Sequence, residues 1–290
     1  MKAHINAVLR TAVLSVALAT LCGCASLVNR ASERFADNLG RGILNQDDPA
    51  TVAEGLPAYL LLLDGLLEGD PDNAGTLRAA ARLYGAYAGN FIDDPVRAAR
   101  LSARAFDYAR RASCIDQREL CAALRAPYEA WEAAVAGQSG PQAAARMYAL
   151  GSAWAGYIQT HSDDYAAIAA IPRVGLLLER AVALDAGLDG GMPHVYLGVL
   201  NSLRPAAVGG EPEKGRAAFE RAIELSAGRN LMARTLMARH YARLVFDQEL
   251  HDAQLRAVLE ADPRAPGLTL MNTLAQAQAR QLLDDSSDYF

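Results

Sequence analysis

The sequence contains almost no lysine. Lys2 and Lys214 are its only lysines, so arginine supplies nearly all of the 28 basic side chains among the 290 residues. The formal net charge is −5, and no run of lysine and arginine is longer than the pair Arg110-Arg111. Proteins that bind nucleic acid neutralise its phosphates with clustered lysine and arginine. The composition therefore argues against a nucleic-acid partner.

Signatures of catalysis are absent as well. The sequence has no Gly-x-Ser-x-Gly elbow, no Walker loop, no dinucleotide-binding glycine fingerprint and no HExxH zinc motif. Its paired carboxylates, Asp93-Asp94, Asp163-Asp164 and Asp284-Asp285, stand at expected helix starts or in the tail. Carboxylates at a helix start cap free N–H groups. We therefore expect a non-catalytic protein that uses no cofactor and no metal.

Long hydrophobic runs are missing too. An apolar run from Thr11 to Leu21 follows Lys2 and Arg10, and it has the length of a secretory signal rather than of a membrane span. It ends in Leu21-Cys22-Gly23-Cys24, which is similar to a bacterial lipoprotein box with Cys24 as the acceptor. A later run, Ala58 to Leu67, is interrupted by Asp64 and Gly65 and predicts a buried helix.

The lipoprotein box predicts that residues 1–23 are removed as a signal peptide and that Cys24 is lipidated. Cys22 is a poorer acceptor because the bulky Leu21 would precede it, and an ordinary secretory signal is the alternative interpretation. Several acyl chains, at about 0.8 kcal/mol for each buried methylene, anchor a protein stably. Ala25 stands where an aspartate would favour the inner membrane. We expect an outer-membrane lipoprotein facing the periplasm, with residues 24–40 as its tether.

Cysteine is scarce, with four in the chain. Once Cys22 is cleaved away and Cys24 is acylated, Cys114 and Cys121 remain. An even pair in an oxidising compartment favours a disulfide over two free thiols. No histidine lies nearby in the sequence, and two cysteines alone make a poor metal site.

The rest of the chain predicts an all-α protein. Segments rich in Ala, Leu, Arg and Glu have 3.6-residue periodicity, and no segment alternates long enough to indicate a sheet. Glycine, proline and aspartate mark the turns between them. We expect one helical-repeat domain over residues 41–283 and a polar C-terminal tail over 284–290. The predicted helices cover 76–89, 95–111, 127–136, 142–160, 168–184, 212–225, 231–246, 249–260 and 268–283.

A degenerate repeat connects these helices. Gly215, Phe219 and Ala222 place a small, a large and a small side chain on one helix face, and similar spacings recur elsewhere. Small residues let helices approach closely, and large ones fill the groove between them. The pattern is typical of tetratricopeptide-like hairpins stacked into an irregular α-solenoid or compact superhelical domain. The further matches are Val174/Leu178/Ala181, Ala98/Ser102/Ala105, Tyr59/Leu63/Leu66, His251/Leu255/Val258, His194/Leu197/Gly198/Asn201 and Leu77/Ala80/Ala81/Tyr84.

Several short sequence segments point to one family of helical-repeat proteins. They are Ile171-Pro172-Arg173-Val174, the run from Gly190 to Gly198, Gly209-Gly210-Glu211-Pro212-Glu213-Lys214-Gly215, the run from Phe219 to Leu225, Asn230-Leu231-Met232-Ala233 and the run from Leu268 to Thr273. In this order on a lipoprotein, the chain resembles the TatT family, the T component associated with TRAP (tripartite ATP-independent periplasmic) transporters. The resemblance extends from about Arg41 to Leu283. It implies a homotrimer that binds the transporter's periplasmic solute-binding protein, with a cleft and pore for a small apolar ligand.

Aromatic side chains are the first candidates for a ligand or partner groove. The candidates are Tyr84, Tyr87, Trp154, Tyr157 and Tyr196. Helical repeats bind through the concave face of their first helices, where such rings would line a groove. Filling the core is the simpler interpretation of the same rings.

Four polar residues are further candidates. We expect His194 and His240 to form hydrogen bonds between helices rather than catalytic or metal contacts. Asn272 is expected to bond a neighbouring backbone. Arg173 would pair with a carboxylate or face the cleft. The sequence thus favours a passive binding role in a TRAP-type transporter, and the alternative is an envelope-assembly or secretion adaptor that holds peptides in a repeat groove.

Overall fold

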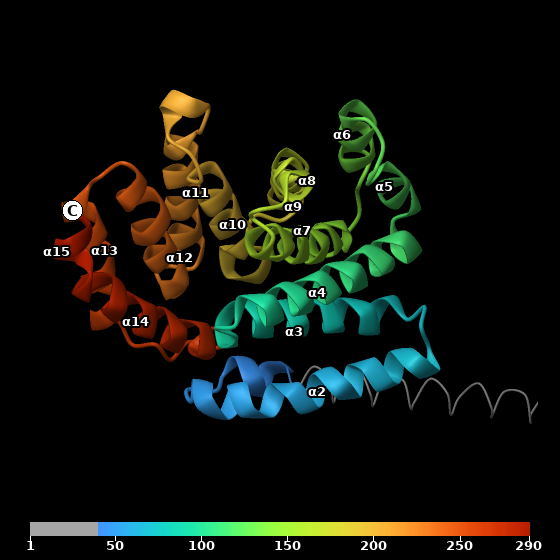
Figure 1. The fold of residues 1–290 in the computed structure, drawn as a ribbon, viewed down its shortest axis with the longest axis horizontal. Helices are drawn as coiled ribbons and strands as arrows, with labels where there is room; N and C mark the ends of the chain where they lie inside the picture. Colours follow the sequence, from blue (N-terminus) through green and yellow to red (C-terminus); the bar gives the residue numbers. More distant parts are fainter. Residues whose placement is uncertain (1–39) are drawn as a thin grey trace, which may run out of the picture.

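A computed structural model describes residues 40–290, which form helices and turns with no strand among them (Figure 1). The all-α prediction is confirmed. The predicted signal peptide, Cys24 and nearly all of the predicted tether lie outside the described residues. The elements are α2 (Pro49–Gly69), α3 (Ala74–Phe91), α4 (Pro95–Asp116), α5 (Arg118–Ala123), α6 (Tyr128–Ala136), α7 (Ala143–Thr160), α8 (Tyr165–Ile168), α9 (Ile171–Leu184), η1 (Leu188–Gly191), α10 (Met192–Asn201), η2 (Ala206–Val208), α11 (Pro212–Leu225), α12 (Leu231–Leu236), the π-helical turn η3 (Met237–Ala242), α13 (Gln248–Glu260), α14 (Thr269–Asp284) and α15 (Ser286–Tyr289).

Helix starts follow the capping chemistry of the sequence. Asp48, Asn73, Asp94 and Asp247 each accept a hydrogen bond from a backbone N–H in the first turn of α2, α3, α4 and α13. Each such cap satisfies an N–H that has no partner inside the helix and contributes roughly 1 kcal/mol. The local sequence therefore determines where these helices begin.

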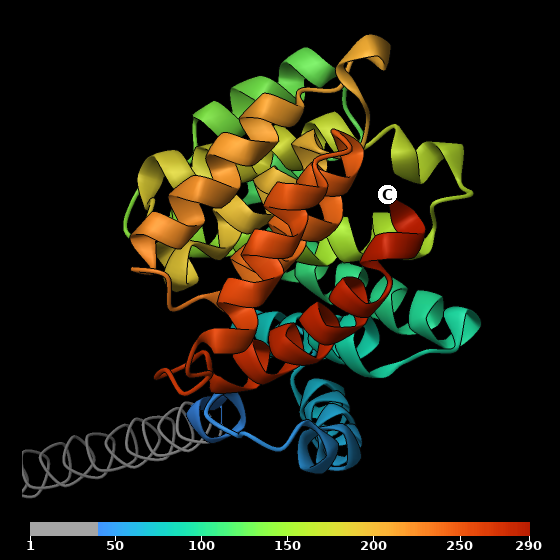
Figure 2. The same cartoon turned by 90° about the vertical axis from the view of Figure 1, so that its left-hand side faces the viewer.

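Helical hairpins pack side by side to build the domain. α3 pairs with α4, α7 with α9, α10 with α11, and α12 together with η3 pairs with α13. The first helices of successive hairpins also contact one another, because α7 packs against α3 and α10, and α12 against α10 and α14. α2 lies at the base of the molecule, packed on α3 and touching α14 (Figures 1 and 2).

The small–large–small pattern predicted from the sequence lies where two helices, α10 and α11, pack closely together. Phe219 of α11 is fully buried, and a Cβ built on Gly198 of α10 would lie 2.7 Å from its ring. A Cβ on Gly215 would lie 2.2 Å from the Ser202 hydroxyl oxygen. α10 and α11 can therefore pack this closely only because both positions are glycine.

Two expectations for α2 hold only in part. The helix buries Val52, Leu56, Leu60 and Leu67. Of the predicted face, Leu63 packs against the core and Tyr59 is half-buried, but Leu66 is exposed. The apolar run from Ala58 to Leu67 is not buried throughout, because Leu61, Leu62 and Leu66 are exposed. α2 is the first helix of the domain, and only one of its sides has a helix to pack against.

Two segments depart from the regular hairpins. The chain after α4 breaks into the short helices α5 and α6, and α8 is a single turn. The last residues, expected as a polar tail, contain α15, and the Phe290 ring lies 5.2 Å from the ring of His251 on α13. The polar composition of residues 284–290 predicts a tail, but the ring of Phe290 packs this end of the chain onto the domain.

Candidate functional site

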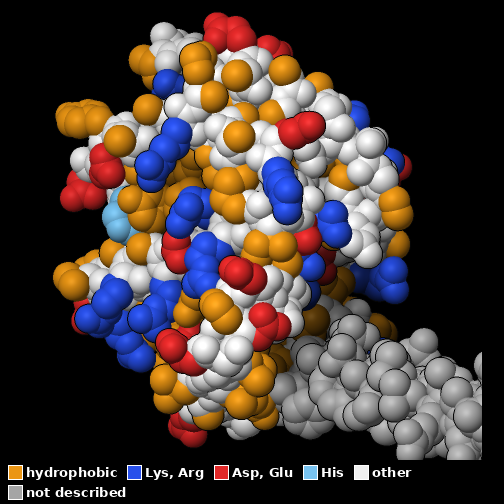
Figure 3. Space-filling model, turned by 90° about the vertical axis from the view of Figure 1, so that its right-hand side faces the viewer, with side chains coloured by type: hydrophobic (Ala, Val, Ile, Leu, Met, Phe, Trp, Pro, Cys, Tyr) orange, Lys and Arg blue, Asp and Glu red, His pale blue; other side chains and the backbone are white. Residues whose placement is uncertain are grey.

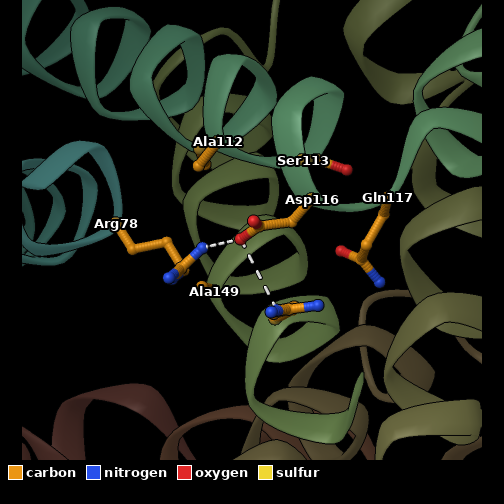
Figure 4. A pocket seen from close by; sticks show the side chains of 8 residues that line it. Arg78, Ala112, Ser113, Asp116, Gln117 and Ala149 are labelled. Atoms are coloured by element: carbon orange, nitrogen blue, oxygen red, sulfur yellow. Dashed lines mark hydrogen bonds and ion pairs between the residues drawn. The ribbon is translucent and has the colours of Figure 1, made fainter. Parts of the chain in front are cut away.

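A polar cluster lies where α3, α4 and α7 meet, at the end of α4. Asp116 pairs with Arg78 of α3 and with Arg146 of α7, whose Nε is 3.5 Å from the carboxylate (Figure 4). Ser113 and Gln117 are buried beside it, and neither the Ser113 Oγ nor the Gln117 Oε1 has a hydrogen-bond partner. The cluster thus combines two guanidinium groups with one carboxylate and two unused polar atoms.

A surface cleft of about 430 Å³ opens next to this cluster. The loop after α6 forms its other wall, and the Gln117 Nε2 donates a 2.7 Å hydrogen bond to the Gln138 Oε1 across it. The lining carries no nucleophile paired with a base, and the described chain holds no group of three or more metal-binding side chains. The chemistry of the cleft suits reversible polar binding.

Cys114 and Cys121 form a disulfide, as the sequence predicts. The bond joins the last turn of α4 to α5 and closes a loop that contains Asp116 and Gln117. It therefore fixes the backbone that carries one side of the polar cleft.

Most of the predicted groove aromatics divide between α3 and α7 in the fold. Tyr84 donates to Asp64 of α2 at 2.7 Å, and Tyr87 packs against Phe91 near the end of α3. Trp154 lies in the core and contacts the rings of Trp131 and Phe106. Tyr157 contacts the same Phe106 ring and stacks on His161. These four side chains do not come together in one groove.

Tyr196, the fifth predicted aromatic residue, lies in a cluster with another tyrosine and a charged pair. Its ring meets that of Tyr148 edge to face at 5.9 Å, where α7 and α10 pack together. Asp189 of η1 lies beside them and pairs at 4.0 Å with Arg82 of α3. Burial raises the pKa of Tyr196 to about 12, and Asp189 acts in the same direction. Burial likewise raises the pKa of Tyr148 well above its usual value, followed by the charges of Tyr196 and Asp189.

We name Tyr148, Tyr196, Asp189 and Arg82 the junction cluster. Both phenols stay protonated at neutral pH and their rings are half-buried, while the two charged side chains reach solvent. Tyr148, Asp189 and Arg82 were not among the site residues predicted from the sequence. The one local signal was the Asp189-Gly190-Gly191 turn, whose three residues all have positive φ.

The remaining candidates are structural or unpartnered. Asn272 accepts from the Leu231 N–H at 3.0 Å and donates to two backbone carbonyls, as predicted. Arg173 donates to the carbonyls of Ala123 and Ala126, and it forms no ion pair with a carboxylate within residues 40–290. Both arrangements fix the path of a loop between helices.

The two histidines form no hydrogen bond within residues 40–290, contrary to the expectation of interhelical bonds. Burial, and then the charge of Arg221, lower the pKa of His194, and its Nε2 is buried without a partner. Burial, and then Arg239, lower the pKa of His240 to about 4. Both side chains are therefore uncharged at neutral pH, and burial rather than bonding determines their state.

The comparisons with known proteins agree with the resemblance noted above. Residues 45–290 match the family described as TAtT: TRAP transporter T-component. No curated protein matches the sequence. The matched range contains every helix from α2 to α15, including the polar cluster and the junction cluster. The chain therefore belongs to the TAtT family of TRAP transporter T-components.

Proposed function

We propose that the chain is a periplasm-facing, lipid-anchored T-component that binds the solute-binding protein of a TRAP transporter without catalysing a reaction. The family match over the whole domain carries this proposal. It is supported by the lack, within the described residues, of a group of three or more side chains that could hold a metal ion. A stack of helical hairpins is also a scaffold suited to holding partners.

The junction cluster is the surface we assign to this binding. Tyr148 and Tyr196 supply an aromatic pair that is enriched at interfaces because it combines apolar area with a hydroxyl group. The side chains of Arg82 and Asp189 are 61% and 41% exposed, so they can meet charges on a partner. A small apolar solute would contact the two rings, whereas the solute-binding protein would also contact the charged pair.

Charge reversal tests this assignment while sparing the core. We expect Arg82→Glu to weaken binding to a TRAP solute-binding protein of the same organism at least tenfold, measured by isothermal titration calorimetry. Arg100→Glu is the matched control, because Arg100 is exposed on α4 and forms no ion pair with any residue from 40 to 290. Equal affinity for both variants would remove the junction cluster from the interface.

Native mass spectrometry of the chain isolated from its periplasm tests the function itself. A complex with a solute-binding protein, or a homotrimer that carries a small apolar molecule, supports the proposal. A monomer that carries peptides of outer-membrane or secretion machinery supports the adaptor instead.

The anchor has its own test. Cys24→Ala should release the chain from the outer membrane into the soluble periplasmic fraction, because the proposed acyl chains would be lost. Continued attachment of this variant to the membrane contradicts the proposed anchor.

A further inference from the structure

The outer side of α2 is an apolar face that no described residue covers. Leu61, Leu62 and Leu66 are 70%, 51% and 53% exposed, and Ala58 and Gly65 among them are exposed too. Spacings of three and four residues place these five positions on one side of the helix. We call them the α2 face. The opposite side of α2 packs on α3.

The only charge within this part of α2 points away from the face. The Asp64 carboxylate accepts hydrogen bonds from Tyr84 of α3 and Tyr108 of α4, each at 2.7 Å, and pairs with Arg104 at 3.0 Å. Its charge is therefore satisfied inside the domain, and the outer side stays apolar. Glu54 and Glu68 lie beyond the two ends of the leucine cluster.

α2 resembles a membrane segment in composition but belongs to the folded domain. Among the described helices it is the one long and apolar enough to cross a bilayer. Its buried leucines pack on α3, however, and it also touches α14. A helix held by the domain on one side can present only its other side to lipid.

The α2 face lies at the end of the molecule where the described chain begins. The Gly267 N–H donates to the Asn45 side chain at 2.7 Å, and Arg264 pairs with Asp47, so the chain just before α2 is fixed at the base. Figures 1 and 2 show α2 at this base. In Figure 3, hydrophobic side chains gather over the lower end of the molecule.

The proposed anchor would keep this end close to the bilayer. The peptide from Cys24 to Gly40 spans at most about 55 Å when fully extended, at roughly 3.4 Å for each residue. A tethered surface meets its target at high effective concentration, so a small apolar contact is sufficient. A stable contact with a second copy would bury about 800 Å² on each partner, far more than three partly exposed leucines offer.

We propose that the α2 face rests on the lipid bilayer that anchors the chain, with Leu61, Leu62 and Leu66 at the boundary of headgroups and acyl chains. The proposal rests on the proposed lipid anchor at Cys24. α2 contains no lysine or arginine, so the contact is apolar and does not require anionic lipid. It holds the domain in one orientation, with α2 toward the membrane and the α10–α11 turn toward the periplasm.

A fluorophore that senses polarity tests this contact in the full-length acylated protein, reconstituted into phosphatidylethanolamine–phosphatidylcholine vesicles. In the processed protein Cys22 is removed with the signal peptide, Cys24 is acylated and Cys114 is bonded to Cys121, so a cysteine introduced by Leu62→Cys is the free thiol to label. Val208→Cys is the matched control, because Val208 is 63% exposed in η2 at the opposite end (Figure 1). We expect a blue shift and at least threefold stronger quenching by spin-labelled lipid at position 62.

Two results would overturn the proposal. The label at position 62 could stay as accessible to water as the label at 208, or it could be shielded without lipid in a protein whose native mass is that of an oligomer. Adding Leu61→Gln and Leu66→Gln should at least halve the blue shift while leaving the circular dichroism spectrum unchanged. Failure of the anchor itself is seen separately, as an N-terminal peptide without acyl mass on a protein that leaves the vesicles.

Discussion

Phe219 of α11 fills the space that the missing side chain of Gly198 leaves on α10. A Cβ at position 198 would lie 2.7 Å from the Phe219 ring, which is fully buried and cannot retreat. Gly198→Ala should therefore lower the free energy of unfolding by about 1–3 kcal/mol through overpacking. Urea unfolding followed by circular dichroism measures the change.

Gly156→Ala is the control for this variant. Gly156 lies within α7, and a Cβ there would meet nothing within 4 Å. Alanine is the better helix former by roughly 0.5–1 kcal/mol, so this variant should be slightly more stable than the natural chain. Equal effects of the two substitutions would show that helix propensity, rather than the Phe219 contact, determines stability at position 198.

Asp64 connects α2 to the next two helices. Its carboxylate accepts from Tyr84 and Tyr108, and Asp64→Ala would leave both hydroxyl groups without this acceptor. We expect a loss of about 2–4 kcal/mol in the free energy of unfolding, since hydrogen bonds to charged groups are the stronger ones. Glu68→Ala, at an exposed position with no partner, should change stability by less than about 0.5 kcal/mol. Equal losses would contradict the role of Asp64.

The sequence was informative wherever structure depends on neighbouring residues. Asp94 and Asp164 cap helices as expected of carboxylates at helix starts, and the Gly215, Phe219 and Ala222 spacing identified a packed face. Cys114 and Cys121 stand seven positions apart across a helix end, so their pairing also depends mostly on local geometry. Periodicity and capping report on such short-range relationships directly.

Contacts between helices that are far apart in the chain could not be predicted from the sequence. Tyr148 and Asp189 come together only because α7, η1 and α10 pack in one place, and no spacing in the sequence encodes that contact. The run around Leu62 indicated a buried helix because hydropathy gives a side chain's polarity but not whether another helix covers it. A helix at the end of a stack has one uncovered side, and its position in the stack is a property of the fold.

The disulfide should stabilise the irregular region after α4. Replacing both Cys114 and Cys121 by serine avoids a free thiol and should cost about 2 kcal/mol, the low end expected for a short closed loop. Hydrogen exchange should accelerate between α4 and α5, where Asp116 and Gln117 line the polar cleft. Unchanged exchange in this segment would show that α5 is held by its packing alone.

His240 should make the stability of the chain fall in mild acid. Burial, and then Arg239, lower its pKa in the folded chain to about 4, whereas an unfolded histidine has a pKa of about 6.5. The unfolded chain therefore binds a proton more readily between these two values. The free energy of unfolding is therefore highest above about pH 6.5, and it declines as the pH falls toward 4.

Replacing His240 tests this pH dependence. The pKa difference corresponds to at most about 3 kcal/mol, and the partial solvent contact of the ring reduces this to about 1–3 kcal/mol. His240→Gln removes the titrating group, so the loss of stability between pH 7 and pH 4.5 should be smaller than in the natural chain. Urea unfolding at both pH values gives the two differences, and the measurement at pH 7 accounts for any packing change. If the natural chain and the variant lose the same free energy, protons bind elsewhere and His240 is not the group responsible.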